Sequence, residues 1–182
     1  MRVAYAICFT VLFWTSCSFN TRGTKALNPG ELLLDSILGQ KLEIVKRNAF
    51  LHTKYRLTDT VLEDEGVEWK ALAVHDKVNN ALLALLEANW QDSMHISRIT
   101  IVDSSISIGA FYVGATFKDI KAIVDTSKLN NSPDGELSFT CVNDSRIHFL
   151  MELPDSSPLA MGVGSLAEIP DELLVNGIVL QE

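Results

Sequence analysis

The residues most able to do chemistry in this chain are its histidines, and they are dispersed. The four histidines occupy four separate segments, at His52, His75, His95 and His148. None belongs to an HExxH pair and no Cys-x-x-Cys sequence is present, so the sequence lacks the spacings that hold zinc. It also lacks the Gly-x-Ser-x-Gly elbow of one large class of hydrolases. We therefore predict no catalytic residues, no bound metal and no cofactor.

Two groups of polar residues could bind a ligand. Glu63, Asp64 and Glu65 are adjacent in the stretch LEDEG, and oxygen-rich loops can bind Ca²⁺. Their spacing is not the alternating one of an EF-hand loop, which favours a solvated turn. The second group lies in a hairpin that we expect from residues 136–142 and 146–152, with Asn143–Ser145 as its loop.

The register of that hairpin would separate an apolar face from a polar one. On the apolar face Leu137, Phe139 and Cys141 would oppose Met151, Phe149 and Ile147. On the polar face Thr140 would oppose His148 and Glu136 would oppose Glu152. Opposed like charges are unfavourable unless water or a cation screens them. We predict a ligand-binding site from these residues, although an exposed sheet face explains them equally well: Glu136, Thr140, His148 and Glu152.

The first 17 residues have the pattern of a leader. Residues 3–14, VAYAICFTVLFW, form an uncharged apolar run after Arg2. A run of about 12 residues is shorter than the ~20 that a membrane-spanning helix needs. It has the length of the apolar region of a secretory signal, and the small residues Thr15 and Ser16 follow it. We predict a signal peptide over 1–16.

This leader resembles the lipobox of bacterial lipoproteins, in which small residues precede a cysteine that becomes the first mature residue. The resemblance implies that Cys17 carries lipid on its sulfur and on its new amine; Trp14 stands where the family usually has leucine. The alternative is an ordinary signal peptide cleaved nearby, which would leave Cys17 as a thiol. Ser18, by analogy with sorting rules that read the residue after the cysteine, favours the outer membrane facing the periplasm, with the cell surface as an alternative.

The other two cysteines fit a lipidated Cys17. Cys8 would leave with the leader, and Cys141 would then have no partner for an internal disulfide. An unmodified Cys17 could instead pair with Cys141. Residues 17–30 are polar and contain Pro29-Gly30, which predicts a flexible tether to a single globular domain over 31–182.

The acidic balance of the chain argues against nucleic acid. The formal charge is −8, and loss of the leader with Arg2 would take it to −9. Without a Lys/Arg cluster, the sequence lacks the basic surface that phosphate backbones require.

The elements that must position these residues are mainly strands. Alternation of apolar and polar residues predicts strands at 41–45, 50–59, 67–74 and 96–108. Residues 76–90 fit either a helix, from their Ala and Leu content, or a hairpin with a turn at 76–80, and we favour the hairpin. Residues 175–182 are expected to form a turn or an edge strand.

Three short helices are expected as well. The first covers 30–38, between Pro29 and Gly39. The second follows Thr116, which has the spacing of a capping box with Asp119, and places Phe117, Ile120, Ile123 and Val124 on one face. A third, from Ser165, is kept short by Pro170. The sequence thus predicts an α+β fold, mainly an antiparallel sheet with two or three short helices packed on one face.

Residues 96–125 and SPDGELSF at 132–139 resemble a group of small uncharacterised lipoproteins from Bacteroides-like bacteria. More distantly, the helix at 116–125 followed by a hairpin is similar to outer-membrane-assembly lipoproteins and to the β-lactamase-inhibitor-like fold. Neither resemblance implies an activity.

Two functional hypotheses follow. The first is a lipid-anchored, non-enzymatic binding or assembly module of the cell envelope, which would expose an apolar or aromatic patch at Trp69, Trp90 or Phe111. The alternative is an envelope hydrolase or small-ligand binder whose site forms only in three dimensions. It predicts a deep pocket that holds at least two of the histidines beside carboxylates. A purely structural spacer is a third interpretation.

Overall fold

The computed structural model describes residues 34, 36–132, 135–154 and 166–182. The predicted leader, Cys17, the predicted tether and Ser165 lie outside the described residues. So does most of the helix expected at 30–38, of which Leu34, Ser36 and Ile37 are described and helical.

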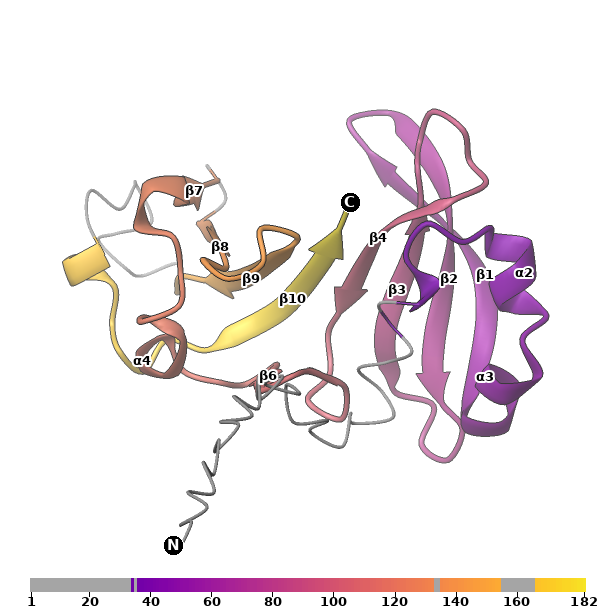
Figure 1. Cartoon of the computed structure of the whole chain (residues 1–182), viewed down its shortest axis with the longest axis horizontal. Coiled ribbons are helices and arrows are strands. Elements are labelled where there is room, and N and C mark those ends of the chain that lie inside the picture. The colour runs from indigo at the N-terminus through magenta and orange to yellow at the C-terminus, as the bar shows by residue number, and fades with distance from the viewer. Residues whose placement is uncertain (1–33, 35, 133–134, 155–165) are drawn as a thin grey trace, which may run out of the picture.

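One eight-stranded antiparallel sheet organises the molecule (Figure 1), in the order β1-β2-β3-β4-β10-β9-β8-β7. A second, two-stranded sheet pairs β5 with β6. The α+β class and the mainly antiparallel sheet expected from the sequence are confirmed. The strands are β1 (Tyr55–Asp64), β2 (Val67–Asp76), β3 (Leu82–Ala88), β4 (Ile96–Ile101), β5 (Ser107–Ile108), β6 (Phe111–Tyr112), β7 (Asn130–Asn131), β8 (Glu136–Thr140), β9 (Ile147–Glu152) and β10 (Val175–Gln181).

The helices are short and contribute apolar side chains to one core cluster. Leu51 of α3 and Phe117 of α4 are both buried in it. Figure 1 shows α2 and α3 beside β1, and α4 in the other half of the molecule. No helix of the described residues is both long and apolar enough to cross a membrane. The helical elements are α2 (Leu42–Lys46), α3 (Ala49–Lys54), α4 (Phe117–Ile120), η1 (Thr126–Lys128) and η3 (Leu166–Glu168).

The strands expected at 41–45 and at the start of 50–59 are wrong, because α2 and α3 occupy these positions and β1 begins only at Tyr55. Asn48 explains why a helix, α3, forms at the start of 50–59. Its Oδ1 accepts hydrogen bonds from the backbone N–H groups of Phe50 (3.0 Å) and Leu51 (3.3 Å), and so caps the start of α3. Leu51 and Tyr55 are four residues apart, a spacing that serves a helix face as well as a strand.

The hairpin favoured for 76–90 is confirmed, since β2 pairs with β3 around a turn at 77–80. Asp76 Oδ1 accepts from the N–H groups of Val78 (2.7 Å) and Asn79 (3.0 Å), and Asn80 has a positive φ of 63°. This local turn chemistry outweighs the helix propensity of the Ala- and Leu-rich run after it. The strand expected over 96–108 is interrupted: β4 ends at Ile101, and a turn leads into β5.

The hairpin of β8 and β9 has the predicted register. Leu137 lies opposite Met151 and Phe139 opposite Phe149, and all four side chains are fully buried. Cys141 is buried too, as the apolar face requires, and its N–H donates to the carbonyl of Ile147 at 2.8 Å.

Helix α4 begins where the capping box predicts but ends early. Asp119 Oδ2 accepts from the backbone N–H of Thr116 (2.9 Å) and from its hydroxyl (2.7 Å). The helix stops at Ile120, whereas the sequence pattern extended it through Ile123 and Val124. The next residues pair with the end of β8 instead, because the carbonyl of Ile123 accepts from the N–H of Val142 at 2.7 Å.

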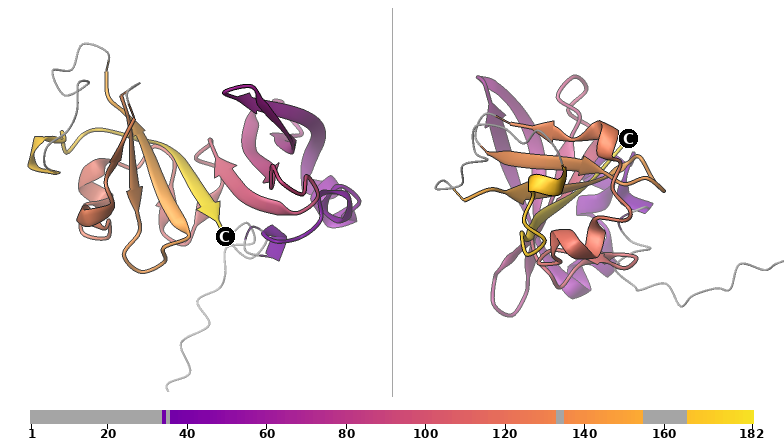
Figure 2. Two further views of the ribbon diagram at one scale, coloured as in Figure 1. Left: turned by 90° about the horizontal axis from the view of Figure 1, so that it is seen from above. Right: turned by 90° about the vertical axis from the view of Figure 1, so that its left-hand side faces the viewer.

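The expectation of a turn or edge strand at 175–182 is wrong. Strand β10 lies in the middle of the sheet, where Ile178 pairs with Ile101 of β4 on one side and with Phe149 of β9 on the other. Its run Ile-Val-Leu at 178–180 is buried on both faces, which is the pattern of a central strand. Figure 2 shows the two halves of the sheet inclined to each other and meeting at β4 and β10.

Candidate functional site

The strand register divides the sheet into an apolar face and a more polar face. Side chains alternate between the two faces along each strand, so residues paired across strands share a face. The apolar face includes Leu72, Leu86, Ile99, Leu180 and Ile147, which belong to the core cluster. On the opposite face a row of polar side chains crosses from β2 to β8, and we call it the polar band: Trp69, Glu87, Arg98, Thr100, Gln181, His148 and Thr140.

Glu87 lies near one end of the polar band and is buried, with 5 % of its surface exposed. Its carboxylate accepts hydrogen bonds from the indole Nε1 of Trp69 (3.2 Å) and from the hydroxyl of Thr100 (2.7 Å). Arg98 Nε lies 3.6 Å from the same carboxylate. Burying a carboxylate is costly unless donors and an opposite charge surround it, and these three neighbours supply both. The network therefore holds the indole of Trp69 in one orientation.

An open pocket of about 370 Å³ lies beside this network. It is bounded by the tip of the β1–β2 hairpin and by the loop between β3 and β4. Trp90, in that loop, is 62 % exposed, whereas Trp69 is partly buried. The pocket thus combines aromatic surface with charged groups of both signs. Its lining residues are Asp64, Glu65, Val67, Trp69, Glu87, Ala88, Trp90, Ser97 and Arg98.

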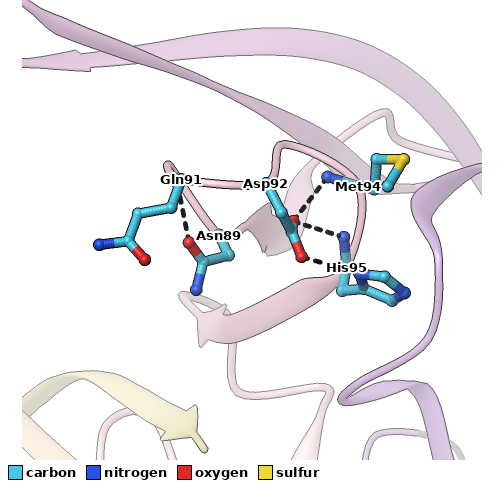
Figure 3. A network of polar contacts seen from close by, with 5 residues as sticks. All are labelled: Asn89, Gln91, Asp92, Met94 and His95. Atoms are coloured by element: carbon cyan, nitrogen blue, oxygen red, sulfur yellow. Dashed lines mark hydrogen bonds and ion pairs between the residues drawn. The ribbon is translucent and has the colours of Figure 1, made fainter.

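The loop that carries Trp90 is held by its own side chains (Figure 3). Asn89 Oδ1 accepts from the N–H of Gln91 at 2.8 Å. Asp92 Oδ1 accepts from the N–H groups of Met94 (2.9 Å) and His95 (3.1 Å), and its Oδ2 lies 2.8 Å from His95 Nδ1. The backbone bond from Met94 and the contacts with His95 lower the pKa of Asp92 to about 2. The charged carboxylate therefore fixes the loop on which Trp90 stands.

His148 lies at the other end of the polar band. Its Nε2 is 2.9 Å from Gln181 Nε2, and its Nδ1 is 3.2 Å from the hydroxyl oxygen of Thr140. Because an amide N–H can only donate, Nε2 must accept, and the ring proton belongs on Nδ1. This arrangement fits the neutral imidazole. Burial lowers the pKa of His148, and the positive charges of Arg98 and Lys128 lower it further, against a smaller opposite effect of the Ser145 backbone.

The structure brings the four sequence-predicted site residues together as two pairs. Thr140 contacts His148, and Glu136 lies opposite Glu152 with both side chains exposed. The two pairs are four residues apart along each strand, or about 13 Å. Ligand binding by these residues stays a prediction.

We expect His148 to make stability depend on pH. A histidine whose pKa is lowered by folding takes up a proton in the unfolded chain first, so its contribution to stability is present above about pH 6.5 and is lost as the pH falls below it. Between pH 7.5 and 5.5, His148→Gln should therefore lose less free energy of unfolding than the wild type, measured by urea denaturation. His52→Gln, the same change at an exposed histidine, is the control. Equal pH slopes for the wild type and His148→Gln would contradict the assignment.

The other three histidines have separate local contacts. His52 Nε2 lies 2.5 Å from the carbonyl of Lys46, and His75 Nδ1 lies 3.3 Å from the carbonyl of Asn80. His95 contacts Asp92 in the β3–β4 loop. No histidine lines the pocket beside Trp90. Within the described ranges no three His, Cys, Asp or Glu residues come together as a metal site. A hydrolase or small-ligand site at these histidines stays a prediction.

Sequence reasoning identified two of the pocket residues and missed its polar network. Trp69 and Trp90 were expected in an exposed patch, whereas Phe111 packs edge-on against Phe149 with ring centroids 5.2 Å apart. Glu87 and Arg98 carried a signal, since Glu87 interrupts an otherwise apolar strand and Arg98 is the one charged residue of β4. Such a charge implies a partner on a neighbouring strand, but strand order must be known to find it.

Comparisons with known proteins define the fold and no more. No family model matches the sequence, and no curated protein matches it. Among solved structures, the fold is similar to that of the uncharacterized protein YfeY from Escherichia coli, with a TM-score of 0.54 and 16 % sequence identity. The match covers 74 % of this chain and 86 % of that chain. The two proteins thus share a fold that spans most of both.

Proposed function

We propose that this protein is a non-enzymatic binding module of the cell envelope, anchored by lipid at Cys17, and that it binds its partner in the pocket between Trp69 and Trp90. The pocket is the observation that carries the proposal. It offers an exposed indole, a second indole held by Glu87, and charged groups at the rim. Aromatic residues with a few fixed polar groups are the usual lining of a binding site.

The anchor rests on the sequence, in which an uncharged run and two small residues precede Cys17. A polar tether after it would let the domain stand off an outer membrane and face the periplasm. The proposal also keeps the expectation that two or three short helices pack on one face of the sheet. The pocket, at the edge of the polar face, would then stay free for a partner.

Protection of the pocket in cells tests this function. Ser97→Cys places a thiol in the lining while leaving both indoles in place, and the other described cysteine, Cys141, is buried. We expect maleimide to label Ser97→Cys at least several-fold more slowly in intact cells than in the purified full chain in detergent.

The matched control is Val78→Cys, in the β2–β3 turn, whose side chain is 95 % exposed. It should be labelled at the same rate in cells and after purification. Equal labelling of Ser97→Cys in both settings would contradict an occupied pocket. Equal slowing at both positions would count against it too, because the protection would then be unrelated to the pocket.

A further inference from the structure

The rim of the Trp69–Trp90 pocket carries uncompensated negative charge. Three of its lining residues are carboxylates and one is a guanidinium, which leaves two negative charges. Arg98 lies beside Glu87, so the excess belongs to Asp64 and Glu65 at the tip of the β1–β2 hairpin. Among the described residues, neither of these two forms a salt bridge.

The aromatic surface beside these carboxylates suits a cation. The face of an indole attracts an ammonium or guanidinium group, and the attraction grows when the cation leaves water. Trp90 is exposed enough to offer such a face, and the hydrogen bond from Trp69 to Glu87 holds the second indole in place. Carboxylates next to indoles therefore favour a ligand with an apolar stem and a positive end.

We propose that the pocket binds a lysine or arginine side chain from an extended segment of a partner protein. This proposal rests on the binding function proposed above and names its ligand. The pocket, at about 370 Å³, lies near the lower end of the range for ligand sites of about 300–1,000 Å³, which fits one side chain. The formal charge of −8 steers a basic partner towards the protein.

A peptide fits this place better than a free cation because polar groups continue away from the pocket. Arg98, whose side chain is 44 % exposed, can donate to a backbone carbonyl of the bound segment. Beyond Arg98, its cross-strand neighbour Gln181 extends the polar band along the same face. The side chain would enter the pocket while the backbone of the segment follows the band.

Two peptides that differ by one charge test the proposal: acetyl-Gly-Ala-Lys-Ala-Gly-amide and the same peptide with norleucine in place of lysine. Each is titrated into the full chain in detergent micelles, and the indole N–H signals of Trp69 and Trp90 are followed by NMR. We expect the lysine peptide to shift both signals and to bind at least tenfold more tightly than the norleucine peptide. Its affinity should fall as salt is raised.

The double variant Asp64→Asn/Glu65→Gln should remove most of the lysine preference. Glu43→Gln/Glu172→Gln changes the net charge by the same amount at exposed positions outside the pocket, and it should keep the affinity within about twofold, since screened distant charges contribute little. Equal binding of the two peptides, no binding of either, or equal losses in the two double variants would each overturn the proposal. The labelling of Ser97→Cys in cells separates the failure of this proposal from the failure of the binding function. If Ser97→Cys is protected in cells but the lysine peptide is not preferred, the binding function stands and only its basic ligand is ruled out.

Discussion

Removal of residues 175–182 is expected to abolish cooperative folding of the whole domain. Strand β10 joins β4 to β9, and four of its side chains are buried: Val175, Ile178, Val179 and Leu180. Burial of each such side chain contributes about 1.5–3 kcal/mol, so together they supply about 6–12 kcal/mol. A whole domain has a stability of only about 5–15 kcal/mol. The loss is therefore as large as the margin that keeps the chain folded.

Urea denaturation followed by far-UV circular dichroism checks this result. The truncated chain should show no sigmoidal transition, and it should aggregate, because β4 and β9 would each expose an unpaired edge. Removal of Glu182 alone is the control and should leave the transition in place. A truncated chain that unfolds at the wild-type urea midpoint would show that β10 is not needed for the sheet.

The second large effect is expected at the amino terminus. Cys17→Ser should move the protein from the membrane fraction to the soluble fraction, since serine has no sulfur to carry lipid. Each acyl CH₂ in the membrane contributes about 0.8 kcal/mol, and three chains hold far more firmly than the single chain that gives reversible binding. The change is therefore expected to be close to all-or-none.

Fractionation with immunoblotting measures the location, and intact mass spectrometry measures the acyl mass on the mature amino terminus. Cys141→Ala is the matched control, because it removes the other mature cysteine and should keep the protein on the membrane. A Cys17→Ser protein that stays with membranes, or a wild type without acyl mass, would rule out the anchor.

Local signals in the sequence were sufficient for the hairpins. Asp76 and Asn80 specify the β2–β3 turn, and the alternation around Asn143–Ser145 sets the register of β8 and β9. Both features depend on residues close together in the chain. The same holds for the start of α4, where Thr116 and Asp119 are three residues apart.

Features that depend on strand order could not be predicted in the same way. The apolar run in β10 fits a central strand, an edge strand or a turn until its neighbours are known. The prediction of a strand at the start of 50–59 was wrong for a different reason. The side-chain cap from Asn48 outweighed the alternating pattern and began helix α3 there. The pocket also depends on strand order. Trp69, Glu87 and Arg98 come from three strands, and the register of the sheet alone brings them together.

The central place of β10 also determines when this protein can fold during its synthesis. A nascent chain that has emerged as far as residue 174 contains β1–β4 and β7–β9, but it lacks the strand that lies between these two sets in the sheet. The sheet closes only after residues 175–181 have left the ribosome. Until that moment the eight-stranded sheet is incomplete, because β10 is the strand that pairs with both β4 and β9.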